Sequence, residues 1–479
     1  MSLTPGEIKQ VFDRLSARLR RQQVLCDRVD SWLRPELEAG FEIPRKATRE
    51  HRALQALSRT PWLLLVVGNV VQAMYVNGVQ GEHGRSDEAW RLWMSNDLSA
   101  RQIANHRAMI AYGHSYGVVT QPMLGEKNPR IRFVSPRRMV VEYDDMGAEP
   151  YPAVALEKLA GIGGDTRYLL RVPGREYWLR QGQEVPGPEL GGLRIEAERE
   201  ADLPFVPVVR FANQLDLEGR TVGDVEPFIP TAQRINKTAY DRLLVQHFAS
   251  WKVKTATGID LPRTPDEYGN IDEDSPVDRE AAAQLGFKLS QEDILMSDSP
   301  DAKFGTLDAS SLDPFVSSWR SDIEALAAVS QTPAYALTGQ LVNLSAEALA
   351  AARAPLAQKV YERQTSAGTS YVRLLRIAAD MAGMKSLAGD DMLRATWQDM
   401  EIRSISQAAD ALGKMRQMLN IPERALWGRI PGVEPADVAE WERIADEEAE
   451  KEVERDPMTA VARRHGMASA EGVSGGEDS

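Results

Sequence analysis

Apolar positions near the start of the chain repeat at helical spacing. Within residues 4–33 they lie three or four apart, which predicts one long amphipathic helix. Thr4 followed by Pro5 is a typical helix start, because threonine caps free backbone donors and proline suits the first helical turn. The apolar positions are Ile8, Val11, Phe12, Leu15 and Leu19.

The same Thr-Pro pair precedes a second predicted helix over residues 60–75. Its apolar run, residues 62–71, is much shorter than the roughly 20 residues of a membrane-spanning helix, so we expect a core helix. A third helix is predicted over residues 87–111, with Gly113 as its end.

The pattern then changes to short apolar stretches separated by Gly, Pro and Asp, which predicts a β-rich region over residues 115–207. Tyr177 and Trp178, together with residues 182–192, are expected to form an exposed excursion from it. The predicted strands are residues 117–120, 131–134, 139–143, 153–156, 168–172 and 206–211.

Helical periodicity returns over residues 227–251, and residues 254–308 are mixed and rich in turns. Ser311 is the expected cap of the next helix, whose apolar residues follow the offsets of one helical face closely. Residues 332–343 are predicted as a loop. These apolar residues are Leu312, Phe315, Val316, Trp319, Ile323 and Leu326.

Ser345 is the expected cap of a long helix that reaches about residue 382 and is kinked at Pro355, because proline removes a backbone donor. Helices follow at 404–419 and 436–455. The charged end of the last one is typical of a solvated face with ion pairs four residues apart, and could also repel DNA. Residues 456–479 are rich in Gly, Ser and charge, and we expect them to be disordered. The fold class is α+β.

Composition narrows the possible functions. The chain has 479 residues, a net charge of −13 and one cysteine, Cys26, which excludes an internal disulfide and any multi-cysteine metal site. No signal peptide is expected at the start, which fits assembly in a reducing cytoplasm. The negative charge argues against gripping nucleic acid through a basic face, but it allows DNA to slide past.

Candidate catalytic and metal-binding residues do not form a recognisable set. The sequence has no GxSxG elbow and no GxxxxGK[ST] phosphate loop. His106 and His114 are differently placed, and Cys26 lies on a polar helix. We therefore expect no enzymatic activity and no cofactor.

Paired and clustered carboxylates have ordinary explanations. The pairs at 144–145 and 390–391 lie near glycines and are attributed to turns. The cluster Asp272, Glu273 and Asp274, with Asp278 and Glu280 nearby, could ligate Ca²⁺ or Mg²⁺, but it lacks calcium-loop spacing and is better explained as a solvated loop.

A series of segments in a fixed order resembles the portal proteins of siphophages, particularly the actinobacteriophage type, over about residues 1–430. The segments are GNVVQAMYVNGVQ (68–80), WRLWMSNDLSARQIANHRAMIAYGHSYGVV (90–119), PRIRFVSPRRMVVEYD (129–144), PVVRFANQ (207–214), GDVEPFIPTAQRINKTAYD (223–241), SQTPAYALTGQLVNLSAEALAAARAPLAQKV (330–360) and ATWQDMEIRSISQAADALGKM (395–415).

The resemblance implies a portal-type subunit with long stem and wing helices, a β-rich wing region, a small clip and a helical crown. The implied regions are a wing (1–226), a first stem helix (227–253), a clip (254–308), a second stem helix (309–331), a tunnel loop (332–344), a kinked wing helix (345–395), a crown (396–455) and a disordered tail (456–479).

The implied function is a dodecameric ring at one capsid vertex of the virion, assembled in the host cytoplasm and serving DNA packaging and ejection. Implied partners are double-stranded DNA passing without sequence specificity, the terminase large subunit, a head–tail connector or adaptor, and the major capsid and scaffolding proteins, with no membrane. Two alternatives stay open. One is another ring or adaptor protein of the phage head, and the other is a head maturation enzyme.

The predicted loop before the long helix has an unusual composition, since residues 331–343 contain no Lys, Arg, Asp or Glu. It is either a channel lining that touches DNA without gripping phosphates, or an ordinary helix connection. Its candidate channel residues are Thr332, Tyr335, Thr338, Gln340 and Asn343.

Overall fold

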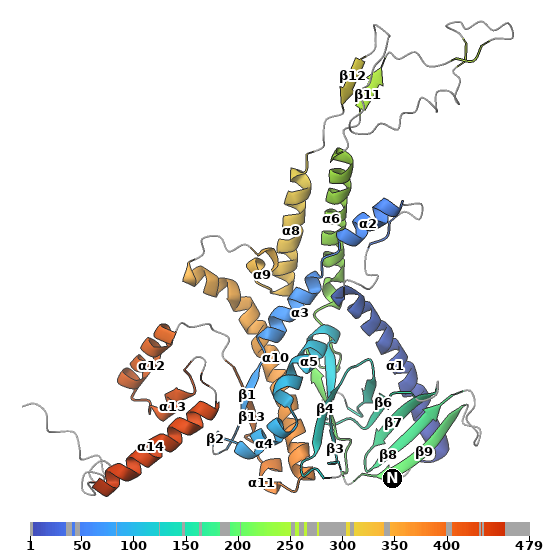
Figure 1. The fold of residues 1–479 in the computed structure, drawn as a ribbon. Coiled ribbons are helices and arrows are strands. Elements are labelled where there is room, and N and C mark those ends of the chain that lie inside the picture. Colours follow the sequence, from blue (N-terminus) through green and yellow to red (C-terminus); the bar gives the residue numbers. More distant parts are fainter. Residues whose placement is uncertain are drawn as a thin grey trace, which may run out of the picture. The chain divides into compact units, whose positions relative to one another are not determined.

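A computed structural model gives the fold of this mixed α+β chain (Figure 1). The residues it describes are 3–34, 41–43, 48–82, 84–123, 125–145, 149–161, 165–182, 192–201, 203–250, 254–257, 263–265, 275–276, 303–306, 311–339, 345–398, 405–430, 433 and 435–455. The acidic cluster at 272–274, the residues around it and the tail after 455 lie outside these ranges.

The chain divides into two compact units. Unit 1 contains residues 1–24, 70–223 and 358–479, and unit 2 contains residues 25–69 and 224–357. Three of the four boundaries fall within helices, namely α1 (Pro5–Leu33), α3 (Trp62–Gln72) and α10 (Ala346–Met381), and the fourth lies between residues 223 and 224.

The largest sheet of unit 1 is an antiparallel meander with the strand order β5-β6-β7-β8-β9. The first part of α1 lies across it (Figure 1), and Ile8, Phe12, Leu15 and Leu19 form a common core with the inward side chains of the sheet. This is the apolar face that the sequence predicts. The strands are β5 (Met139–Glu142), β6 (Val154–Lys158), β7 (Thr166–Val172), β8 (Arg175–Gln181) and β9 (Leu193–Glu200).

The start of α1 is capped as the sequence predicts. The Thr4 hydroxyl accepts from the Glu7 amide at 3.4 Å, and the Glu7 carboxylate accepts from the Thr4 amide at 2.7 Å. This reciprocal pair is a capping box, which satisfies free donors at a helix start. The Glu7 carboxylate also accepts from the Thr4 hydroxyl at 2.8 Å, and the hydrogen bonds that it accepts from the Thr4 amide and hydroxyl lower the pKa of Glu7.

The prediction that Tyr177 and Trp178 lie in an exposed excursion is wrong. Both belong to β8, and Tyr177 is 1% exposed in the core under α1, where its hydroxyl accepts from the Leu3 amide at 3.0 Å. The adjacent polar residues obscured the alternation of this strand, because the outer face of an antiparallel sheet can be polar. Residues 183–191 lie outside the described part of the chain.

A second sheet of unit 1 has the order β10-β3-β4, formed by β3 (His114–Thr120), β4 (Arg130–Val134) and β10 (Val208–Ala212). Helix α10 packs closely on it at Gly117, where a Cβ atom would lie 2.4 Å from a Leu374 methyl carbon. Glycine is therefore required at this position for the helix to approach the strand.

The third sheet joins distant parts of the sequence, with the order β13-β1-β2. Its strands are β1 (Val76–Gly81), β2 (Gly84–Arg85) and β13 (Arg394–Trp397). The short helix α11 (Lys385–Ala388) precedes β13, and the Asp390 carboxylate accepts from the Met392 amide at 2.9 Å in the connecting turn. This confirms the turn explanation for Asp390.

Tyr371 on α10 is the centre of the unit 1 core. Its ring contacts the rings of Trp93 and His106, of Phe133 on β4 and Phe211 on β10 in the second sheet, and of Trp397 on β13 in the third. Its hydroxyl lies 2.9 Å from His106 Nε2 and accepts from the Asn105 amide at 3.3 Å. The side-chain oxygen of Asn105 accepts from the Ser115 hydroxyl at 2.6 Å, so a series of buried hydrogen bonds crosses this core.

A buried charge network joins the five-stranded sheet to the β10-β3-β4 sheet. Glu157 on β6 is fully buried and accepts from Arg132 on β4 and from Arg171 on β7. Burial raises the pKa of Glu157, but the two guanidinium groups outweigh it, and the net shift is downward. A buried carboxylate is tolerated here because two cations neutralise it.

The single helix predicted over residues 87–111 is instead two helices, α4 (Asp87–Ser95) and α5 (Leu98–Tyr112). They are separated by Asn96 and Asp97, and Asp97 adopts a left-handed conformation with φ of 52°. Asn and Asp break helices because their short polar side chains compete for backbone groups and tolerate this conformation.

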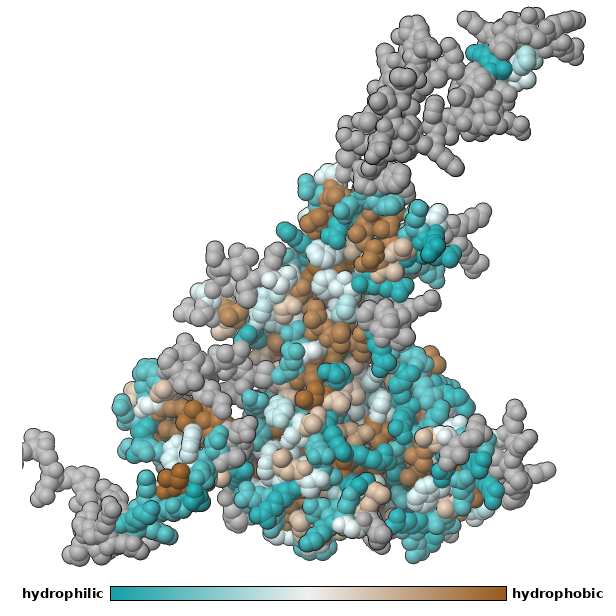
Figure 2. Space-filling view, viewed as in Figure 1, coloured by the Kyte–Doolittle hydropathy of each residue, from teal (hydrophilic) through white to brown (hydrophobic). Residues whose placement is uncertain are grey.

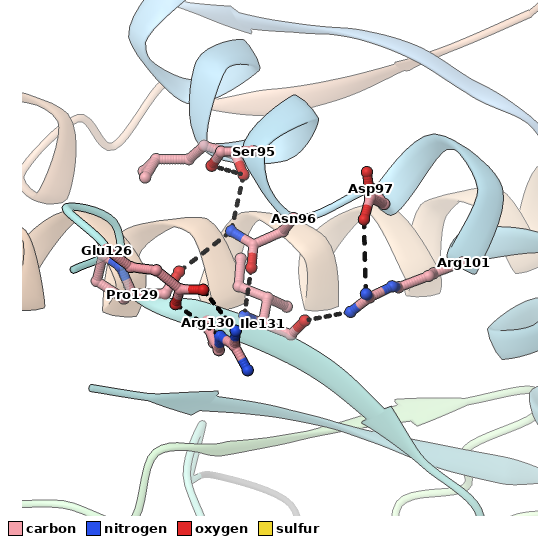
Figure 3. Close-up of polar contacts among 9 residues, drawn as sticks. Ser95, Asn96, Asp97, Arg101, Glu126, Pro129, Arg130 and Ile131 are labelled. Carbon is pink, nitrogen blue, oxygen red and sulfur yellow. Dashed lines mark hydrogen bonds and ion pairs between the residues drawn. The ribbon is translucent and has the colours of Figure 1, made fainter. Parts of the chain in front are cut away.

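Figure 3 shows how Asn96 uses this break. Its side chain donates to the carbonyls of Leu92 at 2.9 Å and Pro129 at 3.1 Å, and accepts from the Ile131 amide at 2.7 Å. One buried side chain thus ends α4 and fixes it to the start of β4.

Unit 2 is built around two helices that lie side by side (Figure 1), α6 (Ile229–Ser250) and α8 (Asp313–Ser330). The short helix η1 (Glu226–Phe228) precedes α6. Arg234 on α6 and Asp322 on α8 form an ion pair at 2.7 Å, and Ile235, Ile323 and Leu326 are buried beside it. Ser311 accepts from the Asp313 amide at 3.3 Å, but the residue at the cap position is Leu312, not Ser311.

Residues 49–72 are long and apolar enough, by composition alone, to cross a membrane. The structure divides them into α2 (Arg49–Leu57) and α3, and most of the apolar side chains of α3 are buried inside the protein. The core helix predicted from residues 62–71 is confirmed. The strands β11 (Lys254–Thr257) and β12 (Lys303–Thr306) also belong to unit 2 and pair antiparallel.

The last helices are α12 (Ile405–Leu419), α13 (Arg424–Trp427) and α14 (Pro435–Arg455). The rings of Trp427 and Trp441 pack edge to face with their centres 6.3 Å apart, and Arg424 forms an ion pair with Asp446 at 2.6 Å. Residues 446–451 of α14 are exposed, and Glu447 pairs with Arg443 four residues earlier, which confirms the predicted solvated face for the side chains that the structure describes.

Replacing Asn96 with alanine should lower the free energy of unfolding by about 3 kcal/mol, because the Ile131 amide and Pro129 carbonyl would be left buried without partners. Urea denaturation of the subunit measures this. Asn69→Ala is the matched control, since in the described part of the chain the Asn69 side chain donates to the Leu65 carbonyl of its own helix. Equal losses in the two variants would contradict the bridging role of Asn96.

Acid should destabilise unit 1 through His106. Burial lowers its pKa from the ordinary 6.5 to about 4, so the unfolded chain binds a proton that the folded chain does not. The free energy of unfolding is therefore unaffected by protonation of His106 above pH 6.5. It falls as the pH drops from 6.5 toward 4, by about 3 kcal/mol in all. Urea denaturation across this pH range should show that the free energy of unfolding depends less steeply on pH in His106→Gln than in the parent. An unchanged slope would contradict this assignment.

Candidate DNA-channel segment

The candidate channel segment begins where α8 ends. Gln331 adopts a left-handed conformation with φ of 54°, which turns the chain out of the helix. The Thr332 amide then donates to the Ala327 carbonyl at 3.0 Å. This hydrogen bond satisfies one of the carbonyl groups that a helix end leaves free.

Thr332 is held inside the protein. It is 4% exposed, and its hydroxyl accepts from the buried Ser330 hydroxyl at 2.9 Å. Its side chain therefore secures the turn between α8 and the next helix and does not present a surface to a passing duplex in this conformation.

Within residues 332–343, predicted as a loop, the described part contains a short helix, α9 (Ala334–Thr338). Pro333 precedes it and Gly339 ends it with φ of 69°, a conformation that favours glycine. Thr338 is exposed, and its hydroxyl donates to the Ala334 carbonyl at 3.0 Å. Gln340 and Asn343 lie outside the described residues.

Tyr335 is tied to the start of α10. Its hydroxyl accepts from Arg353 Nε at 2.7 Å, and the guanidinium carbon lies 6.0 Å from the centre of its ring. The charge of Arg353 is thus directed to the tyrosine. No motif in the sequence indicates this contact, because the two residues are 18 positions apart on different helices.

The helix after the segment begins as predicted. The Ser345 hydroxyl accepts from the Ala348 amide at 3.2 Å, and α10 then continues for 36 residues with Pro355 inside it. Between Gln331 and Gly339 the described chain carries no Lys, Arg, Asp or Glu. An uncharged segment thus lies between two helices of defined start and end.

The half-buried apolar residues of α6 and α8 are a second feature of this unit. Apolar colouring reaches the surface over these helices in Figure 2. Four of their apolar residues are only half-buried: Leu243, Leu244, Phe315 and Val316. Ile235 near the start of α6 and Leu326 near the end of α8 are fully buried. Apolar surface of this kind on a helix pair is typical of a face that another chain covers.

The residues considered for catalysis lie apart and serve the fold. The ring of His106 lies 3.1 Å from the Met74 carbonyl, while His114 lies 2.9 Å from the Thr221 hydroxyl. Burial, with the nearby Arg210 charge, lowers the pKa of His114 to about 3. In the part of the chain that the structure describes, no group of three or more His, Cys, Asp and Glu could hold a metal ion.

Comparison with known proteins gives consistent matches. Residues 30–454 match the family described as phage portal protein, SPP1 Gp6-like. The chain is 25% identical over 368 residues to the portal protein of Mycobacterium phage D29, covering 73% of this chain and 71% of that protein. It is 24% identical over 422 residues to the portal protein of Mycobacterium phage L5, covering 81% and 76%.

The family match covers most of the chain and includes both units, the α6–α8 pair and the uncharged segment. The sequence resemblance is confirmed by it. The chain belongs to the SPP1 Gp6-like family of phage portal proteins, which are structural, non-enzymatic components of the virion capsid and form an oligomeric ring with a DNA channel.

Proposed function

We propose that each subunit contributes α6 and α8 to the channel wall as the two stem helices and residues 332–344 as the segment that faces DNA. The proposed ring is a dodecamer at one capsid vertex. In the same scheme, residues 1–226 form the wing, 254–308 the clip, 345–395 the kinked wing helix and 396–455 the crown.

The observation that carries the ring part of the proposal is the half-exposed apolar surface of the α6–α8 pair. Two helices cannot bury all of their apolar faces against each other, and a neighbouring copy on each side would cover the remainder. In a closed ring each subunit makes the same two contacts, so the covering is repeated at every interface.

The uncharged composition of residues 331–339 supports the channel part. Each lysine or arginine that faces phosphate adds affinity through counterion release, and a conduit must let the duplex move. Arg353 fits this requirement because its guanidinium group is held by Tyr335.

The other proposed partners are those that the resemblance to portal proteins implies. A terminase large subunit would dock on one end of the ring during packaging, and a head–tail connector or adaptor would bind the other end. The major capsid and scaffolding proteins would surround it. No sequence-specific recognition of the duplex is required of any residue in this scheme.

Ring assembly should depend on the apolar surface of α8. Phe315→Asp should abolish the ring and leave folded monomers, because a charge would be buried at each subunit contact. Phe315→Leu is the control and should still assemble. Negative-stain images and light scattering of the purified proteins measure both. Normal rings from Phe315→Asp would remove α8 from the subunit interface, and a parent chain that stays monomeric would contradict the ring itself.

Adding a cation to the channel segment should slow DNA movement. Gln340→Lys adds one phosphate contact per subunit, and repetition around the ring makes the retention strong and sensitive to salt. The expected phenotype is normal ring and procapsid assembly with slowed packaging that recovers as salt rises.

Gln340→Glu is the matched control and should package at the parent rate. Normal packaging by Gln340→Lys particles would contradict the assignment of this segment to the channel. Failure of ring assembly would instead place Gln340 in a subunit interface.

A further inference from the structure

One exposed face of α1 is strongly basic in a chain whose net charge is −13. Arg14, Arg18 and Arg21 are spaced four and three residues apart, so they lie on the same face of the helix, and all three are exposed. The surface around α1 is largely hydrophilic in Figure 2.

The turn between β4 and β5 extends this face. Gln22 donates to the Met139 carbonyl at 2.8 Å and Gln23 donates to the Arg137 carbonyl at 2.8 Å, which fixes the turn against α1. Arg138 in the same turn donates to the Lys158 carbonyl at 3.2 Å and thereby places Lys158 beside it.

We call this set the α1 basic surface: Arg14, Arg18, Arg21, Arg138 and Lys158. Among the residues that the structure describes, the carboxylate paired with it is that of Glu142, which lies 3.1 Å from Arg14 and 4.0 Å from Arg18. One carboxylate neutralises a small part of this charge, so the α1 basic surface is a strong local exception to the negative chain.

Helix α14 has the opposite character. Its exposed acidic residues outnumber its basic ones, and Arg443 is already shared between Glu440 and Glu447. Glu442, Glu448 and Glu450 remain available on the same helix. The acidic residues between 437 and 451 are Asp437, Glu440, Glu442, Asp446, Glu447, Glu448 and Glu450.

We propose that the α1 basic surface is the docking site for α14 of a neighbouring copy in the ring. This inference rests on ring assembly. A ring interface is heterologous, so two different surfaces of the chain meet at each contact and can carry opposite charges. Subunits of charge −13 repel one another, and a basic surface against an acidic helix offsets that repulsion and selects the correct orientation.

The test reverses charge on the α1 basic surface without breaking an internal ion pair. In the described structure, neither Arg21 nor Lys158 pairs with a carboxylate. The double variant Arg21→Glu, Lys158→Glu should raise the concentration needed for half-maximal ring assembly about tenfold or more at low salt, with a smaller effect at high salt. Analytical ultracentrifugation measures this.

Arg91→Glu with Arg107→Glu is the matched control, because these arginines are also exposed in unit 1 and lie outside the α1 basic surface. It should assemble like the parent. The proposal would be overturned if the Arg21→Glu, Lys158→Glu variant formed rings at the same concentration as the parent. Rings of the parent chain in the same experiment would leave the proposed function intact. Normal assembly with weakened DNA retention would overturn it in favour of a nucleic-acid surface.

Reversing the charges on both surfaces tests whether α14 is the helix that binds the α1 basic surface. Glu448→Lys with Glu450→Lys should weaken assembly alone and restore it when combined with Arg21→Glu and Lys158→Glu. Restoration supports contact between α14 and the α1 basic surface. Two independent, additive losses would overturn α14 as the occupant, because residues in contact show coupling and distant residues do not.

Discussion

The fold of unit 1 depends on one side chain, Tyr371, and on the burial of its polar end. Its ring contacts aromatic residues from α4, α5, the β10-β3-β4 sheet and β13, while its hydroxyl is paired with the side chains of Asn105 and His106. A buried tyrosine is stable only where its hydroxyl finds partners, so this cluster specifies one arrangement of the elements around α10. Burial accordingly raises the pKa of Tyr371.

Much of the fold follows from local patterns in the sequence. The starts of α1 and α10 were predicted from Thr4 and Ser345, whose side chains accept from nearby amides as the capping rule requires. Most strands were predicted because apolar alternation and turn residues act over a few positions. The break at Asn96 and the burial of Tyr177 could not be predicted in this way, because both depend on partners far along the chain. Asn96 accepts from the Ile131 amide, and Tyr177 accepts from the Leu3 amide.

The candidate channel segment shows the same division. Its lack of charge is visible in the sequence, and so is the freedom to bend that Pro333 and Gly339 provide. The internal hydroxyl pair of Thr332 and the contact between Tyr335 and Arg353 require the structure, because they depend on how α8, α9 and α10 pack. Composition therefore indicates what the segment avoids, and packing determines which of its side chains are available.

Charge and apolar burial have separate roles in a ring of acidic subunits. A net charge of −13 on each copy favours a wall that repels the duplex, but it also opposes assembly. The half-exposed apolar faces of α6 and α8 can supply association energy that depends weakly on salt. Because the apolar term is non-directional, it cannot by itself set which faces meet. Orientation must then come from directional or charged contacts, and a chain that concentrates cations beside α1 and carboxylates on α14 has the asymmetry that a head-to-tail ring requires.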